Sequence, residues 1–183
     1  AYTQVKILAK AGNVVRDVVL PGFGKVNGFR GRQADTETFY AFTSFTTPAS
    51  IYHYDLQSGQ QTLFRRPQLD FNPDDYQTEQ VFFPSKDGTQ IPMFLTYKKG
   101  LVRNGNTPTF LYGYGGFNIA LTPSFSSANL VWMERGGIFA QANLRGGDEY
   151  GRAWHEAGAK FNKQNVFDDF IACLLYTSDA ADE

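Results

Sequence analysis

The pattern of apolar residues changes near residue 70, and this change constrains the fold more than any other feature of the sequence. Before it, short apolar segments alternate with turn residues, which is typical of antiparallel strands. After it, strand-like segments alternate with segments of helical spacing, which favours an α/β sheet. A stretch rich in proline and aspartate separates the two patterns and predicts a linker. The sequence therefore predicts two domains of different class.

Short strands are expected throughout the first part, at residues 4–9, 14–20, 25–29, 38–44, 50–56 and 60–64. The last two flank Ser58-Gly59, a common hairpin turn pair. Four antiparallel strands in about 40 residues, with no helical segment among them, match one blade of a β-propeller. A small β-sandwich is the alternative. One blade cannot bury both of its own faces, so it needs neighbours.

In the second part, two strands are expected at residues 79–84 and 90–97, joined by the turn sequence Lys86-Asp87-Gly88. The next elements are expected in the order strand (109–112), helix (127–135), strand (138–144) and a helix that follows Asn165. The last helix carries one apolar stripe at helical spacing, formed by Val166, Phe167, Phe170, Ile171 and Leu174. This order favours an α/β sheet that is mainly parallel after its first strands.

Composition excludes several classes of partner. The formal net charge of −1 offers no basic surface for nucleic acid. No apolar run approaches the ~20 residues that span a bilayer, so no membrane partner is expected. The single cysteine, Cys173, excludes an internal disulfide framework and fits a reducing compartment. The chain begins at Ala1 instead of Met, and we expect it to be a fragment.

The most informative motif is TFLYGYGGFN, from Thr109 to Asn118. A buried strand ends here in a glycine-rich loop that leads toward a helix. In α/β-hydrolases, the loop after the third strand supplies part of the oxyanion hole. The phenol of Tyr114 can donate a hydrogen bond to a developing oxyanion, and such donors are worth ~3–4 kcal/mol. A tight turn without catalytic function is the alternative.

A second glycine motif, NLRGGDEYG, runs from Asn143 to Gly151. Arg145 can pair with Asp148 or Glu149 and brace the loop behind an active site. An ordinary solvated turn, with surface ion pairs that contribute little energy, is the favoured interpretation of this motif alone.

Taken together, three strings resemble the prolyl oligopeptidase family of serine peptidases: FTTPASIYHYDLQSG, FLYGYGGFN and FAQANLRGGDEYGRAWHEAGAKFNKQNVFDDFIAC. The resemblance runs from Ala1 to Cys173. It implies a parent with a seven-bladed propeller covering an α/β-hydrolase domain. It also implies cytoplasmic hydrolysis of short proline-containing peptides on the carboxyl side of proline, by a monomer without metal or organic cofactor. Tyr114 matches the family's tyrosine oxyanion donor, and Phe117 matches an aromatic residue that lines the pocket for the proline ring.

The family's nucleophile sits in a G-x-S-x-G turn, and the sequence contains no such motif. Because the order in this fold is Ser, Asp, His, all three triad residues are expected beyond the C-terminus. The chain itself is therefore expected to be inactive. Its only histidines, His53 and His155, are interpreted as structural.

These observations predict a domain plan for the whole chain. Residues 1–68 form the last blades of a β-propeller, 69–78 a linker, and 79–173 the N-terminal half of an α/β-hydrolase domain. Residues 174–183 read LLYTSDAADE, which departs from the family pattern. We interpret them as a foreign tail from a cloning or sequencing adaptor.

Two other functions remain open. One is a related oligopeptidase that prefers basic residues or acylaminoacyl substrates. The other is a non-catalytic β-propeller binding module. Phe117, without an acidic cluster around it, favours proline over a basic residue.

Overall fold

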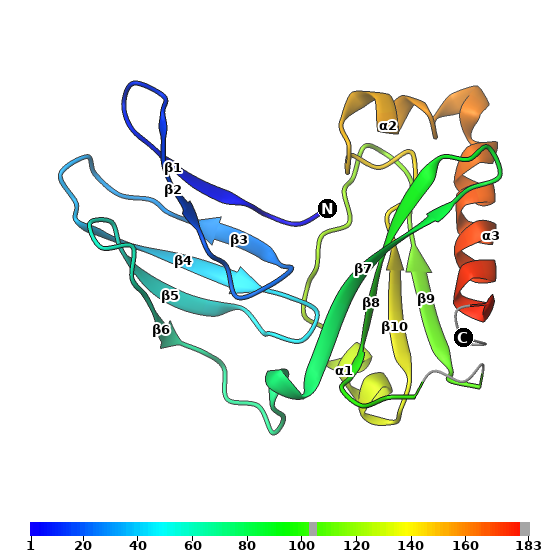
Figure 1. Cartoon of the computed structure of the whole chain (residues 1–183), viewed down its shortest axis with the longest axis horizontal. Helices are drawn as coiled ribbons and strands as arrows, with labels where there is room; N and C mark the ends of the chain where they lie inside the picture. Colours follow the sequence, from blue (N-terminus) through cyan, green and yellow to red (C-terminus); the bar gives the residue numbers. More distant parts are fainter. Residues whose placement is uncertain (103–105, 180–183) are drawn as a thin grey trace. The chain divides into compact units, whose positions relative to one another are not determined.

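A computed structural model of the chain describes residues 1–102 and 106–179 (Figure 1). Contacts between residues divide it into two compact units, which are treated separately. The N-terminal unit consists of Tyr2–Pro73 together with Thr122–Ser126. The C-terminal unit consists mainly of Asp74–Leu121 and the residues from Ser127 onward.

The N-terminal unit is built from strands alone, coloured blue to cyan in Figure 1. Its strands are β1 (Val5–Leu8), β2 (Val14–Val18), β3 (Lys25–Gly28), β4 (Glu37–Thr43), β5 (Ser50–Asp55) and β6 (Gln61–Arg65). β1 and β2 form an antiparallel hairpin, and β3 to β6 form a four-stranded antiparallel sheet in chain order. All the strands predicted in this part are confirmed, with ends shifted by one or two residues.

One face of this four-stranded sheet forms the core of the unit. Alternating residues of β4 and β5 are buried there, in contact with the β1–β2 hairpin: Tyr40, Phe42, Tyr52 and Tyr54. The opposite face leaves Phe39, Ile51 and Phe64 exposed. Strict alternation explains both faces, since successive side chains of a strand point to opposite sides. A sheet with one apolar face left exposed is what a single propeller blade presents without its neighbours.

The C-terminal unit is a mixed sheet with helices. Its strands are β7 (Tyr76–Pro84), β8 (Gln90–Lys98), β9 (Thr109–Gly113) and β10 (Ile138–Ala142), in the spatial order β7-β8-β10-β9. β10 runs parallel to β9 and antiparallel to β8, which itself pairs antiparallel with β7. The helices are α1 (Ser127–Glu134), α2 (Arg152–Glu156) and α3 (Gln164–Asp179), with short 3₁₀ turns η1 (Pro73–Asp75) and η2 (Lys160–Asn162).

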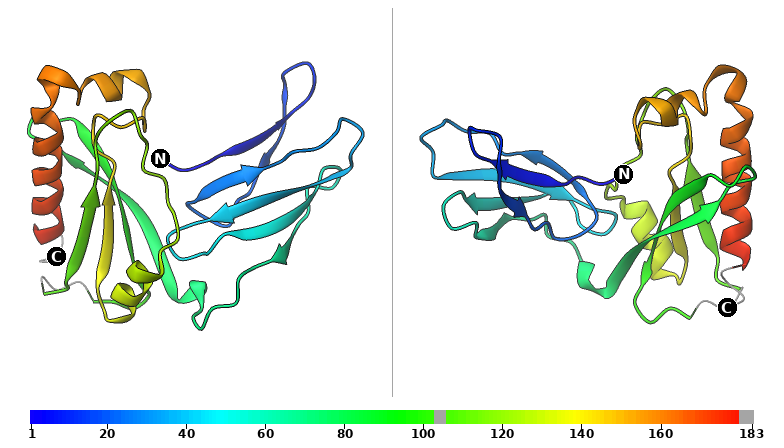
Figure 2. Two further views of the ribbon diagram at one scale, coloured as in Figure 1. Left: turned by 180° about the vertical axis from the view of Figure 1, so that it is seen from behind. Right: turned by 45° about the horizontal axis from the view of Figure 1, so that its top comes forward.

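Both faces of this sheet are covered. Figure 2 shows α3 on one side of the sheet and α1 on the other. Consistent with this, every residue from Ile91 to Tyr97 in β8 is buried, and so is every residue of β10. The prediction that residues 138–144 form a strand buried on both faces is therefore confirmed for Ile138–Ala142. Among the described residues, none of the helices has the length and apolar character needed to cross a bilayer.

The last helix differs from the single stripe that the sequence predicted. Val166 and Cys173 are buried against the sheet, whereas Phe167, Ile171 and Leu174 are all more than half exposed. The first pair keeps the seven-residue spacing of one helix face, and the other three residues lie on an adjacent face.

The same helix continues into the segment interpreted as a foreign tail. Tyr176 stacks on Phe83 of β7, with ring centroids 5.5 Å apart. The foreign origin of residues 174–183 stays a prediction, and the end of that segment, 180–183, lies outside the described residues. The predicted polar loop before β9 also includes residues outside them, 103–105.

Candidate active site

The two glycine motifs meet at one edge of the C-terminal sheet. β9 and β10 are parallel and in register, with Gly113 opposite Ala142. The loops that follow, Gly113–Gly116 and Asn143–Gly147, therefore leave the sheet side by side. In open α/β sheets, the carboxyl ends of parallel strands are the usual place for a ligand. The sequence predicted each loop, and the sheet brings them together.

Backbone contact between the loops requires glycine. Gly115 adopts φ +60°, and a Cβ there would collide with the Val166 side chain and lie 2.9 Å from the Arg145 carbonyl oxygen. Gly146 adopts φ +93°, and a Cβ there would lie 2.6 Å from the Gly115 oxygen. Side chains larger than hydrogen fit neither position.

Hydrogen bonds then tie these loops together. The Gly146 carbonyl accepts from the Asn118 backbone N–H at 3.1 Å and bonds His155 Nδ1 at 2.8 Å. The Gly115 carbonyl accepts from Lys163 Nζ at 2.7 Å. His155 thus contacts the backbone of the site, in agreement with its interpretation as a structural residue. Lys163 was missed by sequence reasoning, because an isolated lysine gives no signal of its target.

Tyr114 and Phe117 lie next to each other on this edge. Their ring centroids are 6.5 Å apart, and the two ring planes are inclined by 28° in a stacked arrangement. Tyr114 is 43% exposed and Phe117 is 84% exposed. Within the described part of the chain, the Tyr114 hydroxyl makes no hydrogen bond. The exposed phenol of Tyr114, beside the exposed ring of Phe117, can bind a ligand group that combines a hydrogen-bond acceptor with an apolar ring.

The backbone at Phe117 is strained. Phe117 and Asn118 adopt φ +51° and +56°, an uncommon conformation for residues other than glycine. Such strain is typically retained at functional sites, where the surrounding structure enforces it. Here the Asn118–Gly146 hydrogen bond holds the strained pair in place.

Behind the loops, Arg145 forms a buried ion pair with Asp169 of α3. Both side chains are at most 5% exposed, and Arg145 Nη2 lies 2.6 Å from Asp169 Oδ1. The Arg145 backbone N–H donates to the same carboxylate at 3.1 Å. Arg145 Nη1 also reaches Asp87 of the β7–β8 turn at 2.5 Å. Charge-assisted bonds of this kind are shorter and stronger than neutral ones.

This pairing corrects the sequence interpretation of the second motif. Among the described residues Arg145 pairs with neither Asp148 nor Glu149, and it does not lie in a solvated turn. The hydrogen bonds that Arg145 donates to Asp169, and then those it donates to Asp87, raise the pKa of Arg145 above its ordinary value. The hydrogen bond from Arg145 is the main cause that lowers the pKa of Asp87 to about 2.

Glu149 has a different role. Its Oε1 accepts from the Leu121 backbone N–H at 3.0 Å and from Asn143 Nδ2 at 3.1 Å. The amide of Asn143, which is fully buried, also donates to the Leu121 carbonyl at 2.8 Å. Glu149 and Asn143 therefore fix the chain that follows Phe117.

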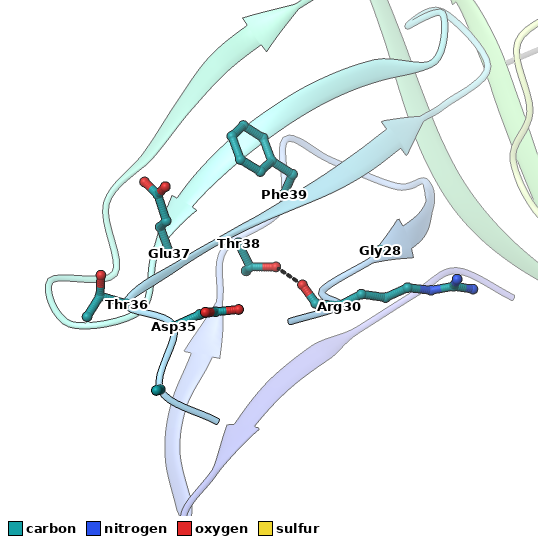
Figure 3. Close-up of a pocket in the computed structure, with 8 residues that line it drawn as sticks. Gly28, Arg30, Asp35, Thr36, Glu37, Thr38 and Phe39 are labelled. Carbon is teal, nitrogen blue, oxygen red and sulfur yellow. Dashed lines mark hydrogen bonds between the residues drawn. The ribbon is translucent and has the colours of Figure 1, made fainter. Parts of the chain in front are cut away.

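A separate pocket lies in the N-terminal unit, beside the start of β4 (Figure 3). Its volume is about 680 Å³. Its acidic residues already have partners: Asp35 accepts from the Arg32 backbone N–H at 2.6 Å, and Glu37 pairs with His53 at 2.7 Å. His53 is thus held within its own sheet.

Among the described residues, no cluster of three or more His, Cys, Asp or Glu side chains is arranged to hold a metal ion.

Two family models match the chain. The model of the prolyl oligopeptidase N-terminal β-propeller domain matches residues 1–67. The model of the prolyl oligopeptidase family matches residues 123–181. Among curated proteins, the prolyl endopeptidase of Elizabethkingia meningoseptica is 51% identical over 96% of this chain. The chain spans about a quarter of that relative, 25% of its length.

Solved structures of prolyl oligopeptidases are similar to this chain in both sequence and fold. A structure from a mechanistic analysis of two prolyl endopeptidases is 48% identical and superposes with a TM-score of 0.87, over 96% of this chain and 26% of its own. Prolyl oligopeptidase B from Galerina marginata, bound to a hydrolysis and macrocyclization substrate, is 34% identical, also with a TM-score of 0.87, over 98% of this chain and 26% of its own.

These matches confirm the predicted fold class, terminal β-propeller blades followed by the first part of an α/β-hydrolase domain. The propeller model covers β1 to β6, and the family model covers α1, β10, α2 and α3. The chain belongs to the prolyl oligopeptidase family.

Proposed function

We propose that this chain is part of a serine-type oligopeptidase that hydrolyses short peptides on the carboxyl side of proline. One observation carries the proposal: an exposed phenol and an exposed phenyl ring, Tyr114 and Phe117, lie 6.5 Å apart where two parallel strands end. The curated relative described above, which is named a prolyl endopeptidase, supports the same activity.

Tyr114 is the oxyanion donor in this proposal. Its hydroxyl is free of hydrogen bonds to other described residues, so it can donate to the carbonyl oxygen of the scissile bond as negative charge develops there. A donor that is already oriented stabilises the transition state without reorganisation, which makes this kind of interaction the largest single contribution in many enzymes.

Phe117 is the substrate-binding residue. A flat apolar ring suits the pyrrolidine ring of proline, which is compact and has no N–H that needs a partner. The exposure of Phe117, 84% in this structure, leaves its ring available for that contact.

We propose that residues outside this chain supply the catalytic Ser, Asp and His. No serine of the sequence lies in a G-x-S-x-G turn. His53 and His155 bond Glu37 and the Gly146 carbonyl, respectively. An oxyanion donor without a nucleophile forms no acyl-enzyme, so the chain by itself is proposed to be inactive.

The proposal extends to the cellular setting and the domain plan. We infer a cytoplasmic, monomeric parent that works without metal or organic cofactor; the single cysteine fits a reducing compartment. We also propose the boundaries 1–68, 69–78, 79–173 and 174–183. The division of contacts near Pro73 supports a boundary within 69–78.

The test uses the full-length protein. A fluorophosphonate probe should label a single serine, and no adduct would favour the binding-module function instead. A panel of chromogenic peptides with proline, lysine, arginine or an acylated residue before the scissile bond then defines specificity. We expect cleavage after proline. Preference for a basic or acylated residue would overturn the proline assignment while leaving the serine hydrolase intact.

A further inference from the structure

The carbonyl oxygen of Gly115 is held from two sides. Gly115 directly follows Tyr114, so the orientation of its peptide affects where the Tyr114 ring lies. On one side, Gly146 approaches so closely that a Cβ there would lie 2.6 Å from this oxygen. On the other side, Lys163 Nζ donates a hydrogen bond to it at 2.7 Å.

Lys163 is itself fixed by its surroundings. It lies between η2 and α3, where its backbone N–H donates to the Lys160 carbonyl at 3.2 Å and its carbonyl accepts from Val166 at 3.1 Å. The side chain is partly buried. None of the ion pairs in the described part of the chain involves Lys163, so its ammonium group is directed at a main-chain oxygen instead of a carboxylate. Lysine usually extends into solvent, because fixing its flexible side chain costs conformational entropy.

The ammonium group also borders the same space as the tyrosine. A Cβ placed on Gly116 would lie 3.8 Å from Tyr114 Cε1 and 3.9 Å from Lys163 Nζ. The Tyr114 ring and the Lys163 ammonium group therefore both lie next to Gly116. Loss of the ammonium group would leave the loop less constrained at the place where it contacts the ring.

We propose that Lys163 is a positioning residue for the oxyanion donor. Its hydrogen bond to the Gly115 carbonyl fixes the Gly113–Gly116 loop, and thereby keeps the Tyr114 hydroxyl directed at the scissile carbonyl. This inference rests on the proposed function. Lys163 acts through Tyr114 and does not touch the substrate. The hydrogen bond from Tyr114 to the oxyanion forms in the transition state. Loss of the Lys163 ammonium group therefore lowers kcat and leaves KM nearly unchanged.

The test compares single variants of the full-length protein on a chromogenic proline peptide. Lys163→Met keeps the aliphatic stem and removes the donor, and it should lower kcat roughly 10- to 100-fold, because small misplacements of catalytic groups have effects of this size. Lys163→Arg retains a donor and should restore most of the activity. Lys86→Met is the matched control: Lys86 is exposed on the β7–β8 turn, and the same chemical change there should leave kcat unaltered.

A double-mutant cycle shows whether Lys163 acts through Tyr114. In a Tyr114→Phe background, Lys163→Met should cost less than about threefold in kcat, since the group it positions is gone. Equal losses in both backgrounds, or an unchanged kcat in the single variant, would overturn the inference. Lys163→Ala replaces Lys163→Met in the cycle where the methionine variant fails to fold. A wild-type protein that does not cleave proline peptides would instead overturn the proposed function.

Discussion

At the scale of single residues, the candidate site depends on backbone atoms that touch. A Cβ on Gly158 would collide with the Gly146 nitrogen, just as one on Gly115 would collide with Val166. Three separate segments therefore meet at positions that accept only glycine. The sequence revealed two of these segments because their glycines are clustered. It did not reveal Gly158, which stands alone between alanines.

Gly115→Ala should destabilise the fold more than an ordinary glycine substitution. It combines left-handed backbone strain of about 1–2 kcal/mol with overpacking of about 1–3 kcal/mol. Gly136→Ala is the matched control. Gly136 also has a positive φ, +85°, but a Cβ there would point into open space, so this substitution adds the backbone strain without the overpacking. Thermal melting of both variants measures the difference. Equal melting temperatures would contradict the close packing at Gly115.

Asp87 makes the fold sensitive to acid. Its pKa is about 2 in the folded protein against an ordinary 3.8, mainly because of the hydrogen bond from Arg145. A carboxylate whose pKa is lowered by folding stabilises the fold above about pH 4, and this contribution is lost as the pH falls toward 2. The free energies of unfolding of wild type and Asp87→Asn, measured in urea, should therefore differ at pH 6, differ less below pH 4, and converge as the pH approaches 2. A difference that stays constant with pH would contradict the pairing.

At the scale of elements, local pattern predicted the strands and the helix α1, Ser127–Glu134, well, but missed the short helix α2. β4 and β5 alternate buried and exposed residues, and that period is visible in the sequence. The five-residue helix α2 was missed, because a single turn is too short to show helical periodicity. β7 begins at Tyr76, within the predicted linker, since the aspartates before it form a 3₁₀ turn that leads directly into the strand.

The packing of α3 can be tested through its cysteine. Cys173 is fully buried, with its Sγ 2.9 Å from Met93 Sδ of β8, and burial raises the pKa of its thiol to about 12. Because the thiolate is the reactive species, iodoacetamide at pH 8 should modify Cys173 at least roughly 100-fold more slowly in the folded protein than in urea. Mass spectrometry of the peptide that contains Cys173 measures both rates. Similar rates would show that α3 does not pack on the sheet as described.

At the scale of the whole molecule, the sequence predicted the two fold types and the two loops of the site, but not the contacts that join distant segments. The sequence offered Arg145 a partner within its own motif or a place in a solvated turn, yet its partners come from α3 and from the β7–β8 turn. Lys163 likewise reaches a loop 48 positions earlier in the chain. Neither contact leaves a local pattern, because each depends on how the sheet brings separate strand ends together.

The proposed function depends on the exposed hydroxyl of Tyr114, which we propose stabilises the oxyanion formed during peptide hydrolysis. The most direct measurement is the kcat of Tyr114→Phe in the full-length protein, on a chromogenic proline peptide. The substitution removes one hydroxyl that bonds no other described residue, so the melting temperature should stay near that of wild type. We predict a decrease in kcat of ~10²–10³-fold. An unchanged kcat in a folded variant would rule out Tyr114 as the oxyanion donor.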